Sequence, residues 1–192
     1  MWYIVVFVNN IVNININEPT PVLGSLDATT DADCFGTATG TATVSASGGT
    51  APYTYDIGSG AQASGSFTGL AAGAYTVTIT DDNNCTNTVP VTINEPVVLS
   101  SNIVSVTDAT CGLANGDFEV TGLNGTAPYQ YSNDNGVTFQ ATGSYSGLTA
   151  GSYNILIQDD NGCQTTITVN VADLSGLTAV IDSQSDADCF GN

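Results

Sequence analysis

The sequence contains no lysine, no arginine and no histidine among its 192 residues. Its 18 acidic residues therefore have no basic side chain to pair with, and the formal net charge is −18 at pH 7. A chain with charge of a single sign repels phosphate groups, so this composition excludes nucleic acid as a partner. Electrostatic attraction to an anionic membrane surface is excluded for the same reason.

The same absences remove most catalytic chemistry. Without histidine there is no Ser-His-Asp triad, and without lysine there is neither a Schiff base nor the cation of a phosphate loop. A pair of carboxylates can hydrolyse glycosides, but the paired aspartates of this chain are adjacent in sequence, at 81–82 and 159–160. We therefore expect a protein that is not an enzyme. Trypsin-like proteases also find no cleavage site in it.

Long apolar runs are absent too. No stretch approaches the roughly 18 consecutive apolar residues that cross a bilayer, so we expect no direct membrane insertion. Residues 2–8 are apolar, but they lack the basic flank and the small-residue cleavage site of a signal peptide. Hydrophobic residues nevertheless make up 42% of the chain and the mean hydropathy is +0.13, which favours a folded protein over a disordered one.

What the sequence does contain is an internal repeat, and the cysteines mark its period. Cys34 and Cys85 lie 51 positions apart, Cys111 and Cys163 lie 52 apart, and Cys189 follows Cys111 by 78. Such regular spacing is the signature of a tandem array of small domains. The odd count of five cysteines then indicates an array that is cut within a repeat.

Other segments recur with the same period and place the repeat boundaries. Gly-Thr-Ala-Pro-Tyr occurs at 49–53 and at 125–129, and Ile-Asn-Glu-Pro occurs at 16–19 and at 93–96. We place complete repeats at 20–96 and 97–174. Residues 1–19 are then the C-terminal strand of a preceding repeat, and residues 175–192 are the start of a following one.

Cysteines spaced in this way in small β-rich repeats predict structural disulfides and an oxidising, extracellular location. We predict one bond per repeat, Cys34–Cys85 and Cys111–Cys163, with Cys189 pairing outside this segment. Reduced, buried thiols are the alternative. Zinc is disfavoured because the cysteines are solitary and histidine is missing.

The local pattern predicts strands. Polar and apolar residues alternate over 12–17, 74–80 and 165–171, as in half-buried strands. For the second repeat we expect seven strands, which fits an all-β, immunoglobulin-like sandwich; they are placed near 99–107, 117–122, 128–133, 137–140, 143–147, 152–158 and 164–171. Tyr75 and Tyr153 each follow a glycine turn at the start of a strand, as in a structural tyrosine corner.

The Asp-Asp-Asn turns have two interpretations. Asx turns before the last strand explain them as local structure. Alternatively, their oxygens form calcium sites, because hard cations prefer several carboxylate and amide ligands. The candidate ligands are Asp81, Asp82, Asp159 and Asp160. Apart from calcium, we expect no cofactor.

These residues resemble a known family. Gly-Thr-Ala-Pro-Tyr-x-Tyr, followed by Gly-x-Tyr and then Asp-Asp-Asn-x-Cys, is similar to the SprB-type repeat of very long surface adhesins in gliding and non-gliding Bacteroidetes. The resemblance covers 34–85 and 111–163. It implies export, by the type IX secretion system, and display as a filament at the cell surface.

Three functions fit these observations. The first is a structural stalk segment of a repetitive adhesin, whose partners are the neighbouring repeats. The second is a fibre subunit that associates with other copies through exposed strand edges. The third is a polysaccharide-binding module in which aromatic side chains stack on sugars; the candidates are Tyr53, Tyr55, Tyr129, Tyr131, Phe139 and Tyr145. Exposure of these rings on one sheet favours binding, and their burial favours the stalk.

Overall fold

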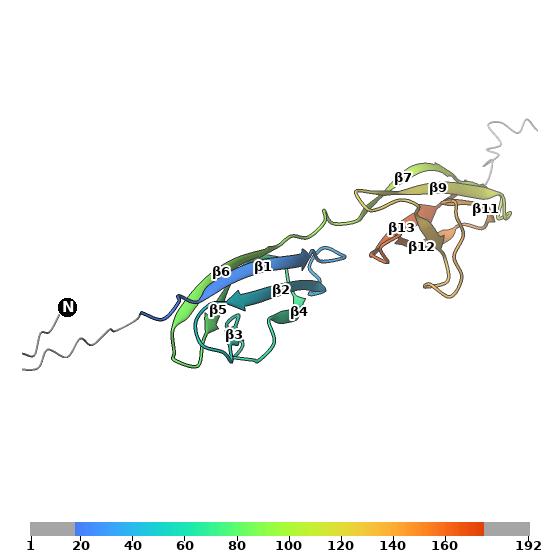
Figure 1. Ribbon diagram of the computed structural model, residues 1–192. Helices are drawn as coiled ribbons and strands as arrows, with labels where there is room; N and C mark the ends of the chain where they lie inside the picture. The colour runs from blue at the N-terminus through green and yellow to red at the C-terminus, as the bar shows by residue number, and fades with distance from the viewer. Residues whose placement is uncertain (1–17, 175–192) are drawn as a thin grey trace, which may run out of the picture. The chain divides into compact units, whose positions relative to one another are not determined.

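The computed structural model describes residues 18–174, and its regular secondary structure over that range consists of β-strands (Figure 1). Two compact units divide these residues. The first holds 18–32 and 38–94, and the second holds 33–37 and 95–174. The second unit thus includes a short loop that belongs by sequence to the first repeat. The predictions for 1–17 and 175–192, Cys189 among them, lie outside the described residues.

The first unit is a sandwich of two antiparallel sheets, each with three strands. One sheet has the order β1-β2-β4 and the other the order β3-β5-β6. These strands are β1 (Leu23–Thr30), β2 (Gly40–Ser47), β3 (Thr54–Asp56), β4 (Ser66–Leu70), β5 (Gly73–Thr80) and β6 (Thr86–Ile93).

The second unit repeats this arrangement, with sheets ordered β11-β9-β7 and β10-β12-β13. Its sandwich strands are β7 (Ser100–Thr107), β9 (Gly116–Leu123), β10 (Gln130–Ser132), β11 (Ser144–Leu148), β12 (Gly151–Gln158) and β13 (Gln164–Val171). A short parallel pair is added to these, between β8 (Ala109–Thr110) and β14 (Asp173–Leu174). The expected all-β, immunoglobulin-like sandwich is confirmed.

The core of each unit lies between its two sheets and follows the predicted alternation. In β5, Val77 and Ile79 are fully buried while the residues between and beside them are not, and in β12 Ile155 and Ile157 repeat this pattern. Side chains on one face of a strand point the same way, so each strand contributes every second residue to the core. Branched apolar residues at these positions are what make the repeat sequence fold as a sandwich.

One expected strand of the second repeat is absent. Residues 137–140 contribute a single bridge, Tyr131 to Gln140, instead of a strand. The carboxylate of Asp134 accepts the backbone N–H of Thr138 at 2.9 Å and its hydroxyl at 2.7 Å. These bonds, together with one from Ser132, lower the pKa of Asp134 to about 2. Short polar side chains that bind the nearby backbone in this way compete with strand pairing.

The first and last strands of each unit run in the same direction. At one end of the first unit, the Asn87 side chain donates to the carbonyl of Val22 at 3.0 Å. At the other end, the N–H of Ala32 donates to the carbonyl of Asn94 at 2.9 Å. Figure 1 shows β1 beside β6 accordingly. In the second unit, a matching bond joins Ala109 N–H to the carbonyl of Ala172 at 2.9 Å.

No helix within the described residues is long and apolar enough to span a membrane.

Candidate functional site

The turn between β5 and β6, residues 81–85, is built around a buried carboxylate. Asp81 is only 5% exposed, and its Oδ1 accepts the backbone N–H groups of Asn83 at 3.0 Å and Cys85 at 2.8 Å. Its Oδ2 accepts the N–H of Thr50 at 2.9 Å. The side chain therefore closes its own turn and also ties it to the loop before β3. We call residues 81–85 and 159–163 the aspartate turns.

The second aspartate turn has the same bonds. Oδ1 of Asp159 accepts the N–H groups of Asn161 at 3.1 Å and Cys163 at 2.9 Å, and Oδ2 accepts the N–H of Thr126 at 3.0 Å. In both turns the residue before the cysteine has a positive φ, 63° at Asn84 and 81° at Gly162. Asn and Gly tolerate this backbone conformation best, which explains the Asn-x-Cys ending of the motif.

The Gly-Thr-Ala-Pro-Tyr segment completes each aspartate turn. A side chain at Gly49 would begin 2.7 Å from Oδ2 of Asp81, and one at Gly125 would begin 2.8 Å from Oδ2 of Asp159. Only glycine leaves room for the carboxylate to reach the next residue's N–H. The Gly-Thr-Ala-Pro-Tyr segment and the Asp-Asp-Asn-x-Cys turn are therefore parts of one structure. The prolines of this segment, Pro52 and Pro128, follow cis peptide bonds.

This geometry supports the Asx-turn interpretation of the predicted calcium ligands. Hydrogen bonding from the N–H of Thr50, and then from Cys85 and Asn83, lowers the pKa of Asp81, while burial opposes the shift. The carboxylate is thus held ionised by backbone donors. Asp82 and Asp160 are exposed. Within residues 18–174 no three His, Cys, Asp or Glu side chains gather as metal ligands. Calcium binding stays a prediction.

Calcium and magnesium should raise the thermal midpoint of the chain equally, relative to chelator. Both ions screen the net charge of −18, whereas the carboxylates of Asp81 and Asp159 are already bound to backbone N–H groups. Thermal denaturation followed by circular dichroism measures this directly. A larger rise in calcium than in magnesium, lost in Asp160→Asn, would instead establish the site that the sequence predicts.

The two tyrosines that the sequence places at corners bind the backbone four residues upstream. The hydroxyl of Tyr75 donates to the carbonyl of Ala71 at 2.8 Å, and that of Tyr153 donates to the carbonyl of Thr149 at 2.8 Å. Both rings also pack against the core of their unit. This is the geometry of a tyrosine corner, and its role is structural.

The aromatic residues considered for sugar binding are not displayed on a sheet face. Tyr55 and Tyr131 belong to the buried cores, with exposures of 8% and 6%. Tyr53 and Tyr129 pack against those cores, and their hydroxyls donate to the carbonyls of Gly48 and Gly125. Phe139 and Tyr145 are half-buried. Burial of these rings favours the stalk over the polysaccharide-binding module.

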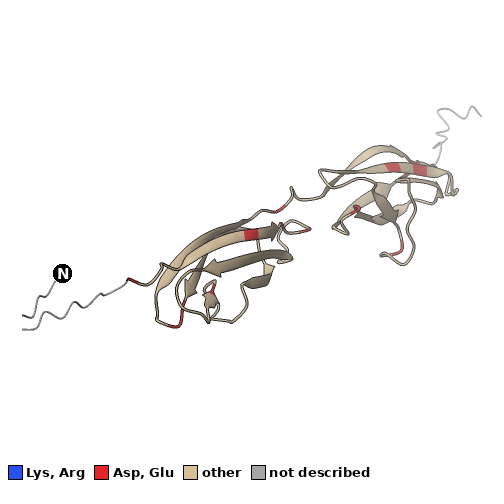
Figure 2. Cartoon of the chain, in the orientation of Figure 1, with Lys and Arg blue, Asp and Glu red and all other residues tan. Residues whose placement is uncertain are grey.

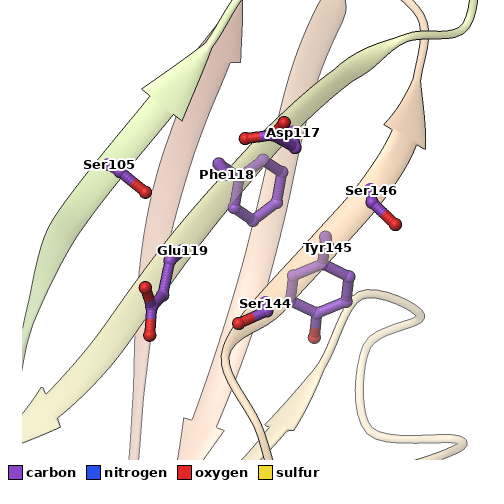
Figure 3. A pocket seen from close by; sticks show the side chains of 7 residues that line it. All are labelled: Ser105, Asp117, Phe118, Glu119, Ser144, Tyr145 and Ser146. Carbon is purple, nitrogen blue, oxygen red and sulfur yellow. The ribbon is translucent and has the colours of Figure 1, made fainter.

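A shallow hollow in the second unit is formed on β7, β9 and β11. Figure 3 shows Asp117 and Glu119 at its sides and the rings of Phe118 and Tyr145 close together. The ring centroids of these two residues are 5.1 Å apart. Burial raises the pKa of Tyr145, followed by the charge of Asp134. Because the rings of Phe118 and Tyr145 pack against the core, the hollow offers hydroxyls and carboxylates but no platform on which a sugar could stack.

In each sequence repeat, a loop that carries the first cysteine follows the first strand, at the opposite end of that strand's sheet pairing from the aspartate turn. We call residues 31–37 and 108–114 the cysteine loops. In the first, Oδ1 of Asp31 accepts the N–H of Asn94 at 2.9 Å, and Glu95 accepts the N–H of Gly36 at 2.6 Å. The linker that leaves the first repeat is thus hydrogen-bonded to its cysteine loop.

The structure contains a disulfide that differs from both predicted pairs. Cys34 is bonded to Cys163, with a Cα–Cα distance of 5.6 Å and 129 residues between them in sequence. Cys85 and Cys111 are exposed free thiols in the structure. The predicted bonds Cys34–Cys85 and Cys111–Cys163 are therefore wrong. The observed bond joins a cysteine of the first sequence repeat to one of the second.

The parallel course of the first and last strands explains this correction. In the second unit, Cys163 precedes β13, whereas Cys111 follows β8, which pairs with the residues just after β13. Eight extended residues separate these two ends by about 26 Å, and a disulfide requires Cα atoms about 4.4–6.8 Å apart. The same order holds for β6 in the first repeat. Cysteines of one repeat therefore lie at opposite ends of its sandwich.

Acidic residues are distributed over both units, and no basic residue accompanies them (Figure 2). The described carboxylates with bonded oxygens mainly accept N–H and O–H groups of turns and loops, as Asp31, Asp81 and Asp134 do. These three acidic side chains are therefore engaged in local structure.

Comparison with known proteins supports the resemblance drawn from the sequence. The model of a family described as the SprB repeat matches residues 26–62. This range contains the first cysteine loop and the Gly-Thr-Ala-Pro-Tyr segment, so the SprB-type character of the repeat is confirmed there. The match indicates a protein of the cell surface or the extracellular space, and a structural module of an adhesin type. No curated protein sequence matches the chain.

Several solved structures match the chain at low identity and low TM-score. Domains 1–6 of the surface layer protein SbsC are 17% identical, with a TM-score of 0.31; the match covers 85% of this chain and 29% of that one. The N-terminal eight Ig domains of the Down Syndrome Cell Adhesion Molecule are 12% identical, with a TM-score of 0.35, 81% of this chain and 25% of that one being covered. Because both TM-scores are low, the fold assignment rests on the strand topology described above and not on these matches.

Proposed function

We propose that the chain is a structural stalk segment of a long, secreted, repetitive cell-surface adhesin. The observation that carries this proposal is the Cys34–Cys163 disulfide, which fastens one sequence repeat covalently to the next. A module that only presents a ligand-binding face needs no such fastening. A segment that transmits tension along an array gains from it directly.

The use of the side chains supports a mechanical role over a catalytic one. Asp81 and Asp159 are held by backbone N–H groups inside turns, and Tyr75 and Tyr153 hold corners. These four side chains are therefore committed to the structure of the repeat itself. The partners of the segment are then the neighbouring repeats, and export through the type IX system follows from the SprB-type resemblance.

Association of copies into a thicker fibre is a second candidate, and one observation favours it. Strand β7 lies at the edge of its sheet, and it exposes Ile103, Val104 and Val106 to between 37% and 54%. An exposed apolar edge strand is a template for pairing with another chain. Repulsion between chains of charge −18 opposes such pairing.

Electron microscopy of the native, unreduced material distinguishes the two candidates. We expect a single file of beads, one for each repeat of about 78 residues, with one chain in cross-section. Several chains packed around a common axis would overturn the stalk and would make β7 the first surface to mutate. Val104→Lys is then the variant of choice, because it places a charge on the exposed edge without touching the core.

A further inference from the structure

We propose that the two exposed thiols are half-cystines of the same inter-repeat kind as Cys34 and Cys163. Cys111 would bond the aspartate-turn cysteine of the repeat that follows it, and Cys85 the cysteine-loop cysteine of the repeat that precedes it. The partner in each case is a cysteine of another SprB-type repeat in the same polypeptide. This inference rests on the proposed function, because it treats the chain as part of a tandem array.

Cys85 is presented by the same turn as the bonded Cys163. The N–H of Cys85 lies 2.8 Å from Oδ1 of Asp81, and the N–H of Cys163 lies 2.9 Å from Oδ1 of Asp159. The carbonyl of each cysteine accepts the N–H of its aspartate at 3.0 Å. An identical backbone therefore holds both cysteines, and one of the two is already shown to accept a cysteine-loop partner.

Cys111 lies in a loop that is anchored to the outgoing linker as the loop of the bonded Cys34 is, although the backbone at Cys111 itself differs, with a φ of 53°. Asp108 accepts the N–H of Ala172 at 2.8 Å, as Asp31 accepts that of Asn94 at 2.9 Å. Asp173 accepts a loop N–H from Gly112 at 3.2 Å, as Glu95 does from Gly36. The linker that leaves each repeat is thus fastened beside a cysteine in both cases.

The path of the chain fixes which cysteines can meet. The linker leaves the first repeat at its cysteine loop, through the bond between Glu95 and Gly36. It enters the second repeat at the aspartate turn, where Leu99 lines the same depression as Gly162 and Cys163. Within the described residues this path joins one cysteine loop to the aspartate turn that comes after it in the sequence, through Cys34–Cys163, and the proposal extends the same pairing to the other junctions.

The bond formation requires an oxidant. The two thiols lose two protons and two electrons as the S–S bond forms, and a disulfide oxidant of the extracellular compartment accepts them and is reduced to two thiols. The same oxidation yields Cys34–Cys163. Because Cys85 and Cys111 are exposed, the oxidant can reach both.

The test compares the chain with an extended chain in which residues 97–174 occur twice in succession, both carrying Cys189→Ser. Each is refolded with a mixture of oxidised and reduced glutathione, and free thiols are counted by alkylation and intact mass. Four cysteines then remain in the first chain, and six in the extended one. We expect two free thiols in both, because Cys111 bonds the added copy of Cys163.

Peptide mapping after cleavage with pepsin identifies the bonded pair, since trypsin has no site. Cys111→Ser in the extended chain is the matched control and should leave the added copy of Cys163 free, while Cys34–Cys163 stays intact. Four free thiols, a Cys85–Cys111 bond, or a disulfide-linked dimer through Cys111 would each overturn the proposal. Microscopy of the native material tests the proposed stalk separately. A single file of beads whose cysteines are free thiols would therefore reject the inter-repeat disulfides but not the stalk.

Discussion

Breaking the Cys34–Cys163 bond should lengthen the fully stretched chain by about 450 Å. The bond closes a loop across 129 sequence positions, and each residue adds about 3.5 Å when extended. While the bond is intact, force applied at the two ends of the chain runs from β1 through the disulfide to β13, and residues 35–162 carry none of it. Single-molecule force spectroscopy with and without reductant measures the difference.

Two variants make this measurement specific. Cys163→Ser should give the long extension without reductant, because its S–S bond cannot form. Cys111→Ser changes an exposed thiol outside the bond and should give the same short extension as the unchanged chain. An extension that reductant does not alter would show that the load path runs through the whole polypeptide, against the structure.

Phe118→Ala should destabilise the second unit by about 3–5 kcal/mol, the usual cost of removing a buried aromatic side chain. Phe118 is 2% exposed, lies in the core between the sheets, and packs its ring against Tyr145 and Tyr153 with centroids 5.1 and 5.7 Å away. Small domains have about 5–15 kcal/mol of stability in total. Denaturation by urea, followed by circular dichroism, should therefore show an early transition for this unit.

The control for this substitution is Val137→Ala in the same unit. Val137 is 81% exposed, so its truncation removes almost no buried surface and should leave the midpoint unchanged. The first unit has its own core and should keep its transition in both variants. Loss of both transitions in Phe118→Ala would mean that the two units unfold as one.

The fold was predictable from the sequence because period-two alternation reports directly on which face of a strand is buried. Val77 and Ile79 illustrate this, since both are fully buried as the pattern predicts. The tyrosine corner was also predictable, because a Tyr that follows a Gly turn at the start of a strand has the sequence pattern of such a corner. The strand predicted at 137–140 was wrong because local hydrogen bonds, which the alternation does not report, decide the structure there. Its apolar residues suggest a strand, while Asp134 and Ser132 hold the backbone in a loop.

The disulfide could not be read from the spacing, and the reason lies in periodicity itself. Cys85 and Cys163 are 78 positions apart, one full repeat, so a repeat pattern treats them as the same position. Choosing between them as partners of Cys34 requires knowing that β1 and β6 are parallel. That is a property of the tertiary fold, and the alternation of polar and apolar residues does not report it.

The disulfide also changes what a single break in the backbone does. A protease that cuts one peptide bond between residues 35 and 162 leaves the two fragments joined through Cys34–Cys163. With the further bonds proposed at Cys85 and Cys111, the closed loops would overlap along the array, and every peptide bond of a repeat would have a covalent bypass. A thread of this kind tolerates damage, since it parts at a cut only where every disulfide that bypasses that cut is also reduced.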